Sequence, residues 1–305
     1  MTVMIFTLIL LFMIAIYTCQ SLACSRFGKY YPGDPAKTSS VFSVLYGGVC
    51  MVFTLVFTAC TGGFPMALSL PTVLFGLANG IVLTTYNQFL LKSSAMGPYS
   101  IVMIFMLSGG LLIPVLWSVI AEGNALNTLQ WIAIVLTLVA FLILNMPKKG
   151  EKATLPFILS CTVLGIANGV YGILMNSQQV MTANTENAGM IVFTFGTSAV
   201  LSFVMMLLPA KGEKFAPGAA VKSAFTFNGA CIAWGLASAL SASVAVNILM
   251  WILSKVNVAV VYAFTNGGVL LVSVLISLLF LGEKCTAVKA FGIALSAAAI
   301  VMLSI

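Results

Sequence analysis

The sequence predicts an all-α integral membrane protein of ten transmembrane helices, built as two inverted five-helix repeats. First, 61% of the residues are hydrophobic and only 6% are charged, whereas roughly a quarter of the residues in soluble domains are charged. Second, uncharged runs of about 20 residues, the length that crosses the hydrocarbon of a bilayer, recur along the chain. Third, short motifs of the first half return in the second half at a constant offset.

Uncharged runs bounded by Gly, Pro, Asn or charged residues define the expected spans. These spans are 2–24, 39–60, 70–91, 99–120, 128–146, 154–176, 188–208, 225–250, 257–281 and 286–305. Because the connecting segments are short, consecutive helices should be antiparallel neighbours within a single transmembrane domain, 1–305. The first run lacks a basic start and a small-residue cleavage site, so it is expected to remain as a helix.

The basic residues are distributed unevenly between the two sides expected for the loops. The odd-numbered loops and their flanks hold Arg26, Lys29, Lys37, Lys92, Lys148, Lys149, Lys152, Lys211, Lys214, Lys222, Lys284 and Lys289. Lys255 alone lies beside an even-numbered loop. Basic loops stay in the cytoplasm, so both termini are expected outside. Without a retention signal or a glycan-rich loop, we expect a multi-pass protein of a bacterial-type inner (plasma) membrane.

An internal repeat divides the chain near its midpoint. The motif Phe75–Ala78 is echoed by Trp234–Ala237, and the pair Gly109–Gly110 returns as Gly267–Gly268 in nearly the same register. With a hinge at Pro147–Gly150, repeat one covers 1–146 and repeat two covers 154–305. Five helices per half is an odd number, so the second half must enter the membrane inverted. Inverted repeats underlie alternating access in secondary transporters, with substrate near the midplane.

Several segments resemble a known family of carriers. Phe280–Leu295 looks like the Gly-Glu-basic junction before the last helix of EamA-like carriers in the drug/metabolite transporter superfamily. Asn247–Leu281 and Tyr86–Glu122 resemble further helices of that family, and Tyr171 resembles an aromatic position of its sixth helix. The chain departs from the family in lacking a tryptophan in the first helix, in having Asn266–Gly268 where proline is frequent, and in its expected orientation. The resemblance implies transport but names no substrate.

Neutral polar residues within the expected spans are the candidates for substrate binding. They are Asn79, Tyr86, Asn87, Asn168, Tyr171, Asn176, Trp234, Asn247, Trp251, Tyr262 and Asn266. Ser108 joins them, because it precedes the first glycine pair as Asn266 precedes the second. Amides beside aromatic rings suit a neutral, zwitterionic or singly positive metabolite. The alternative is that the amides bond between helices and the rings anchor at the membrane interface.

The same inventory argues against other classes of function. All six acidic residues lie in loops or at helix ends, and the chain has no histidine. Proton coupling usually needs a carboxylate inside the membrane. We therefore expect facilitated diffusion, exchange or movement driven by the membrane potential. We expect no enzyme, cofactor or metal site, since the seven cysteines are scattered and no catalytic base lies at depth. The expected partners are the bilayer and a small-molecule substrate, not nucleic acid, and a homodimer stays open. A channel-like or scaffold protein without saturable transport remains the alternative.

Overall fold

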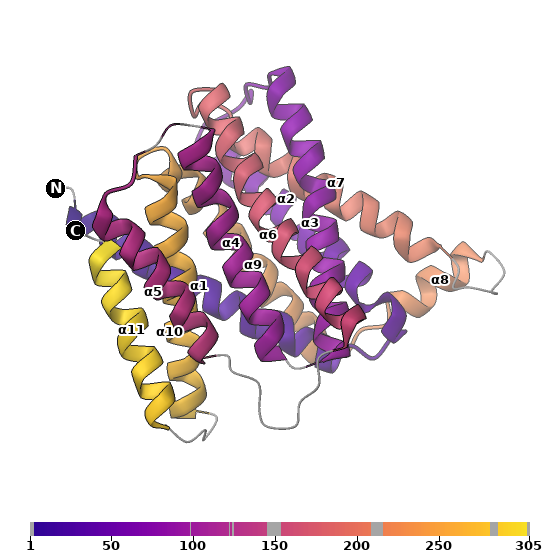
Figure 1. Ribbon diagram of the computed structural model, residues 1–305. Helices are drawn as coiled ribbons and strands as arrows, with labels where there is room; N and C mark the ends of the chain where they lie inside the picture. Colours follow the sequence, from indigo (N-terminus) through magenta and orange to yellow (C-terminus); the bar gives the residue numbers. More distant parts are fainter. Residues whose placement is uncertain are drawn as a thin grey trace. The chain divides into compact units, whose positions relative to one another are not determined.

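The computed structural model is α-helical, with no β-strand among the residues that it describes (Figure 1). It describes residues 3–97, 99–121, 123, 125–144, 154–208, 216–280 and 286–303. The elements are α1 (Val3–Tyr30), the 3-10 helix η1 (Pro35–Lys37), α2 (Thr38–Cys60), α3 (Leu70–Met96), α4 (Tyr99–Ile120), α5 (Thr128–Leu144), α6 (Leu155–Met181), α7 (Asn187–Leu207), α8 (Pro217–Ala224), α9 (Gly229–Leu253), α10 (Val258–Phe280) and α11 (Ala287–Leu303).

Each expected span coincides with one of these helices, and the differences lie at the ends. Helix α1 continues to Tyr30, past Arg26 and Lys29, because charged residues end an apolar run without ending the backbone hydrogen bonds of a helix. Helix α6 likewise continues to Met181. The short helix α8 was not expected, since its sequence is too short and too polar to span a bilayer. The predicted hinge at 147–150 and the Gly-Glu pair at 282–283 lie outside the described residues.

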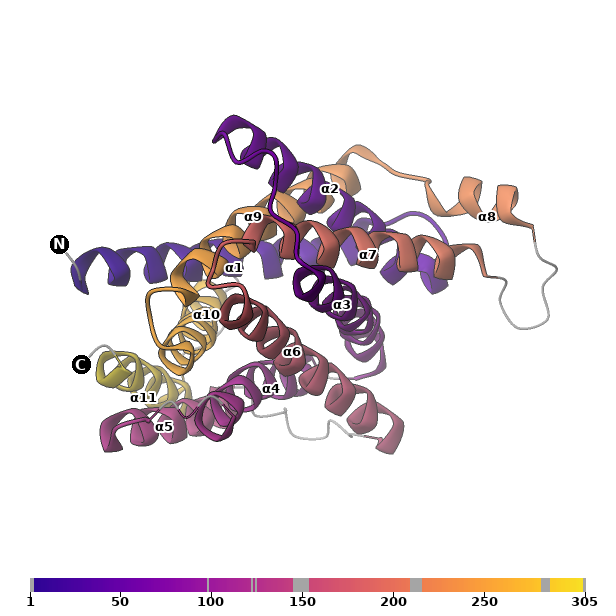
Figure 2. The same cartoon turned by 90° about the horizontal axis from the view of Figure 1, so that it is seen from above.

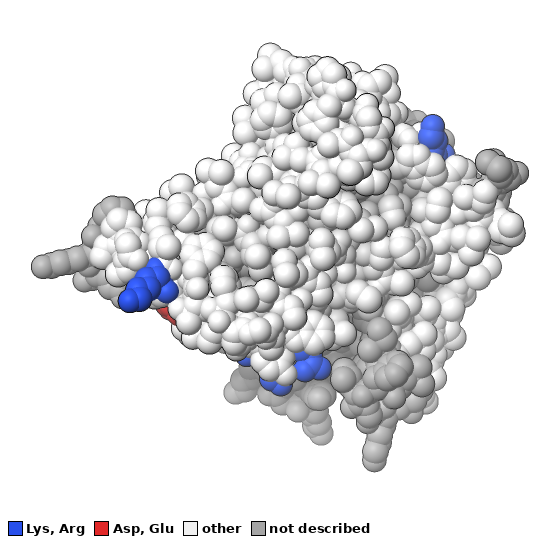
Figure 3. Space-filling model, turned by 180° about the vertical axis from the view of Figure 1, so that it is seen from behind, with Lys and Arg blue, Asp and Glu red and all other residues white. Residues whose placement is uncertain are grey.

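Six helical segments are long and apolar enough to cross a membrane, so the chain has the architecture of an α-helical membrane protein. They lie in α1, in η1 with α2, and in α4, α6, α7 and α9. Helix α3 has 27 residues but does not reach the same hydropathy, because it carries the polar residues Asn79, Asn87, Gln88 and Lys92. The described apolar parts of α5, α10 and α11 are shorter. The face in Figure 3 shows few charged side chains among its described atoms, as a lipid-exposed surface requires.

The chain forms two compact units, and neither coincides with an expected half. Unit 1 contains residues 1–18, 93–173 and 251–305, and within it α5 packs along α11 and α4 packs along α10. Its core is largely aliphatic and aromatic, with Leu111, Val115 and Phe141 fully buried. Each unit therefore draws helices from both 1–146 and 154–305.

Unit 2 contains residues 19–92 and 174–250, and α2 packs along α7 within it (Figure 2). At one end, the Tyr31 hydroxyl donates to the carbonyl of Ala224, 2.6 Å away, which ties the end of α1 to the end of α8. Burial raises the pKa of Tyr31 to about 12, with smaller contributions from Asp34 and Cys231, so this hydroxyl keeps its proton at neutral pH.

Candidate substrate-binding site

Buried amide side chains are confined to unit 2 among the described residues. Asn79, Asn87, Asn176, Gln178 and Gln179 are each at most 4% exposed, and all five belong to this unit. The buried polar side chains of unit 1 are serines and threonines, which can donate back to the helix carbonyl four residues earlier. The two units thus differ in chemistry: unit 2 has a core that can exchange hydrogen bonds with a polar solute.

Several of these buried polar atoms have no hydrogen-bond partner within the described structure. They are Gln20 Oε1, Asn79 Nδ2 and Oδ1, Asn87 Nδ2, Gln178 Oε1, Gln179 Oε1, Thr194 Oγ1 and Ser202 Oγ. All of them lie in unit 2. An unpartnered buried donor or acceptor costs about 1–3 kcal/mol, so each of these atoms is a candidate for a hydrogen bond to an ordered water or a bound solute.

Asn79 bears the largest such cost. Its carboxamide is fully buried, and neither Nδ2 nor Oδ1 has a hydrogen-bond partner. It lies in the middle third of α3, where that helix passes close to α7. A Cβ added at Gly80 would lie only 2.7 Å from the carbonyl oxygen of Thr194, so the glycine allows the approach. Further along, Thr84 Oγ1 and Ser198 Oγ lie 3.1 Å apart, and this hydroxyl contact joins the two helices. Asn79 and Thr194 therefore occupy neighbouring turns of a polar helix crossing.

A second polar group in unit 2 joins α1 to α2 at mid-span. Gln20 Nε2 donates to the Tyr46 hydroxyl at 2.8 Å, and the backbone of Gln20 accepts from Ser238 of α9 at 3.3 Å. The Tyr46 ring lies 5.6 Å from the ring of Phe195, the residue after Thr194 in α7. Aromatic walls beside amides resemble the lining of small-molecule sites. Sequence analysis missed Gln20 and Tyr46, although each is the sole residue of its type in its apolar run.

The other expected residues of unit 2 are more fully engaged. Asn247 Nδ2 donates to Thr54 Oγ1 at 3.2 Å and to the carbonyl of Ser243 at 2.8 Å, so this amide links α9 to α2. Asn176 is buried, and Tyr86 and Trp234 are half-buried. The structure thus separates unpartnered amides on α3 from a partnered amide on α9, which the sequence could not distinguish.

In unit 1 the structure brings Asn168 and Asn266 together at α4. Asn168 Nδ2 donates to the carbonyl of Met106 at 2.9 Å, and Asn266 Nδ2 lies 3.5 Å from the carbonyl oxygen of Gly110. Pro114 has no N–H, so the Gly110 carbonyl lacks the helical donor it would otherwise have. A Cβ added at Gly110 would lie 3.4 Å from Asn266 Oδ1 and closer still to Asn168. Both amides therefore act as contacts between helices, and binding by them stays a prediction.

The remaining expected residues of unit 1 are aromatic or hydroxylic. The Tyr262 hydroxyl lies 3.4 Å from the carbonyl oxygen of Gly172, joining α10 to α6. Trp251 is 44% exposed and its ring lies 6.0 Å from that of Phe6, an arrangement typical of an anchor at the membrane interface. Ser108 and Tyr171 are half-buried.

Several glycines serve close helix packing. A Cβ at Gly165 would lie 2.6 Å from the carbonyl oxygen of Phe105, and one at Gly169 would lie 2.7 Å from that of Gly109. A Cβ at Gly47 would lie 2.6 Å from the carbonyl oxygen of Phe195. These distances leave room only for hydrogen, as in the small-residue interfaces of membrane helices.

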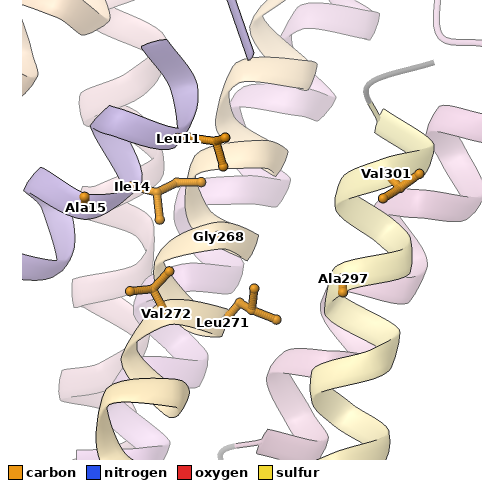
Figure 4. Close-up of a pocket in the computed structure, with 8 residues that line it drawn as sticks. All are labelled: Leu11, Ile14, Ala15, Gly268, Leu271, Val272, Ala297 and Val301. Atoms are coloured by element: carbon orange, nitrogen blue, oxygen red, sulfur yellow. The ribbon is translucent and has the colours of Figure 1, made fainter. Parts of the chain in front are cut away.

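An apolar groove in unit 1 contrasts with the polar core of unit 2. It encloses about 290 Å³ between α1, α10 and α11. Its walls are Leu11, Ile14, Ala15, Gly268, Leu271, Val272, Ala297 and Val301 (Figure 4). These side chains offer no hydrogen-bonding group, so the groove does not suit a polar solute.

The electrostatics of the described residues match a site for uncharged groups. Their acidic side chains are Asp34 and Glu186, and both lie at helix ends rather than inside a helix. No group of three or more His, Cys, Asp or Glu side chains that could hold a metal occurs among them. Neutral amides, hydroxyls and rings are what the described helices offer at depth.

Comparison with known proteins supplies a fold without a function. No protein-family model and no curated protein matches this sequence. Among solved structures, 29 chains are similar. One of them, described only as "Crystal structure of protein", has a TM-score of 0.75 at 16% sequence identity, over 97% of this chain and 95% of that one. At this identity the likeness establishes a shared fold over nearly the whole chain.

Proposed function

We propose that this protein is a secondary transporter that moves a small neutral, zwitterionic or singly positive metabolite by alternating access. The observation that carries the proposal is Asn79, a buried carboxamide with both a free donor and a free acceptor. Burying such a group costs free energy, and only a ligand with the complementary acceptor and donor offsets that cost. The unpartnered Asn87, Thr194 and Gln20 atoms extend the same hydrogen-bonding capacity over three helices.

The proposal includes ten membrane spans in two inverted repeats, 1–146 and 154–305, as in EamA-like carriers of the drug/metabolite transporter superfamily. Its support is the way that helices pair. The second expected span (α2) packs along the seventh (α7), the fourth (α4) along the ninth (α10), and the fifth (α5) along the tenth (α11). Each pair joins counterparts of the two repeats, the pairing that an axis relating the halves would produce. From the uneven distribution of basic residues we infer that both termini lie outside.

A ligand screen tests the proposal. Purified protein is heated with amino acids, nucleosides, sugars and quaternary amines in turn, and the midpoint of unfolding, Tm, is measured. A ligand that binds only the folded state raises Tm with its concentration. We expect at least one class to raise Tm in wild-type protein and to lose most of this effect in Asn79→Leu, while Trp251→Leu keeps it. No concentration-dependent shift with any class, or an equal shift in Asn79→Leu, contradicts the proposal.

A further inference from the structure

A polar cluster surrounds Glu186 at the end of unit 2 where α6 and α9 finish and α3 and α7 begin. Oε2 of Glu186 accepts from the backbone N–H of Ser69 and from its hydroxyl, each at 2.8 Å. Thr72 Oγ1 lies 3.4 Å from Ser69 Oγ and accepts from Gln178 Nε2 at 2.9 Å. The start of α3, the last turn of α6 and the residue before α7 thus share one network. We call Ser69, Thr72, Gln178, Gln179 and Glu186 the Glu186 cluster.

The Glu186 cluster contains hydrogen-bond acceptors without partners, whereas its amide donors are already used. Gln178 Nε2 also reaches Thr182 Oγ1 at 3.1 Å, and Gln179 Nε2 donates to the carbonyl of Met250, so the donors of both amides are used. Their Oε1 atoms have no partner, although Gln178 is fully buried and Gln179 is 2% exposed. The Gln178 carboxamide contacts the network through Thr72, so its unpartnered oxygen lies within one side chain of that network.

The charge of the cluster is negative and uncompensated within the described part of the chain. No lysine or arginine of the described residues is among the groups that shift the pKa of Glu186. Hydrogen bonds from the Thr72 side chain, the Ser69 backbone and the Ser69 hydroxyl, in that order, lower the pKa of Glu186, so the carboxylate is ionised at neutral pH. Helix dipoles do not decide the sign of the local potential, because α6 ends here while α3 and α7 begin here.

We propose that the Glu186 cluster binds a monovalent cation, namely Na⁺ or the ammonium group of a solute. Hard cations take carboxylate and carbonyl oxygens, and carbonyls at helix ends hold Na⁺ in other transporters. A single carboxylate with neutral oxygens balances one positive charge. The binding site does not depend on the carrier proposal, because it is tested by cation binding and not by transport.

The test uses the purified full chain at constant ionic strength, with chloride salts exchanged for choline chloride. Tm is measured against rising NaCl and, in a second series, against methylammonium chloride. We expect a saturable rise in Tm with one of the two cations and none with choline. A response to Na⁺ assigns the site to the free ion, and a response to methylammonium alone assigns it to an ammonium head group. An identical response to choline, Na⁺ and methylammonium overturns the proposal.

Two variants and a matched control locate the site. Glu186→Gln keeps an oxygen that accepts from Ser69 and removes the charge, and Glu186 makes no side-chain cap to α7 whose loss would unfold the helix. We expect at least a tenfold rise in the half-saturating cation concentration. Gln178→Met, which removes the free oxygen, should weaken binding in the same direction. Asp34→Asn, whose carboxylate also lies at a helix start and accepts from Ala36, should bind as wild type. Unchanged affinity in Glu186→Gln and Gln178→Met also overturns the proposal.

Discussion

Replacing Asn79 by leucine should stabilise the protein while removing the solute binding that we propose for it. Leucine has a similar branched shape and no polar atom, so Asn79→Leu relieves the desolvation of a carboxamide that is fully buried and unpartnered at both atoms. Removing one unpartnered polar group should stabilise the protein by about 1–3 kcal/mol. Imperfect packing of the leucine should cost up to about 1.5 kcal/mol of this gain. We therefore expect a net gain of about 1 kcal/mol, which raises Tm by about 1–2 °C in a chain of 305 residues.

The matched control is Asn247→Leu, on α9 of the same unit. This amide has partners in Thr54 and Ser243, so its loss should lower stability by about 0.6 kcal/mol, the average for a hydrogen bond between membrane helices. Both variants are unfolded by SDS titration in mixed micelles and followed by far-UV circular dichroism. Opposite signs are expected. If Asn79→Leu is destabilised as much as Asn247→Leu, then Asn79 has a structural role and the reasoning is refuted.

Three further outcomes follow from the packing and the charges. Gly109→Ala should destabilise unit 1 by about 1–3 kcal/mol, because the new methyl group would meet the backbone of Gly165. Gly48→Ala is the control, because a Cβ at Gly48 has open space around it. In the same titration, this variant should change the unfolding free energy by less than about 0.5 kcal/mol. Asn168→Leu should cost about 0.6 kcal/mol by loss of its bond to α4, read from the same curves; a gain would contradict the packing role. Because the folded-state pKa of Glu186 is lowered, its stabilisation is present above its ordinary pKa and is lost as pH falls through the lowered value. The Tm difference between wild type and Glu186→Gln should therefore shrink between pH 6 and pH 3, and a constant difference would refute this.

Apolar runs predicted the positions of the described helices, because a chain in lipid must pair its backbone groups within helices, and six of these helices are long and apolar enough to cross a membrane. They predicted the helix ends poorly. Helix α1 runs on through Arg26 and Lys29 to Tyr30, and α6 reaches Met181, since polar residues continue a helix as readily as apolar ones do. The early end expected for α6 is why Gln178 and Gln179 were overlooked as site residues.

The candidate site was predictable in composition but not in detail. Asn79 and Asn87 stood out as amides in an apolar run, and the structure buries both. Thr194 gave no signal, because most helical threonines donate to their own helix, as Thr84 does to the carbonyl of Gly80 at 2.8 Å. Whether a hydroxyl or amide has a partner depends on neighbouring helices. Asn266 illustrates this, since it donates to the carbonyl of Tyr262 on its own helix at 2.8 Å and also lies 3.5 Å from the Gly110 carbonyl, which a proline on another helix leaves free.

Counterflow in proteoliposomes tests the central claim most directly. Protein is reconstituted, the vesicles are loaded with the solute that raises Tm most, and uptake of the labelled solute is followed with and without the internal load. The account predicts uptake that saturates with external concentration, is accelerated by internal unlabelled solute, and is lost in Asn79→Leu. Uptake that rises linearly with concentration and ignores the internal load would indicate a channel, and no uptake above empty vesicles would indicate a scaffold; either result contradicts the account.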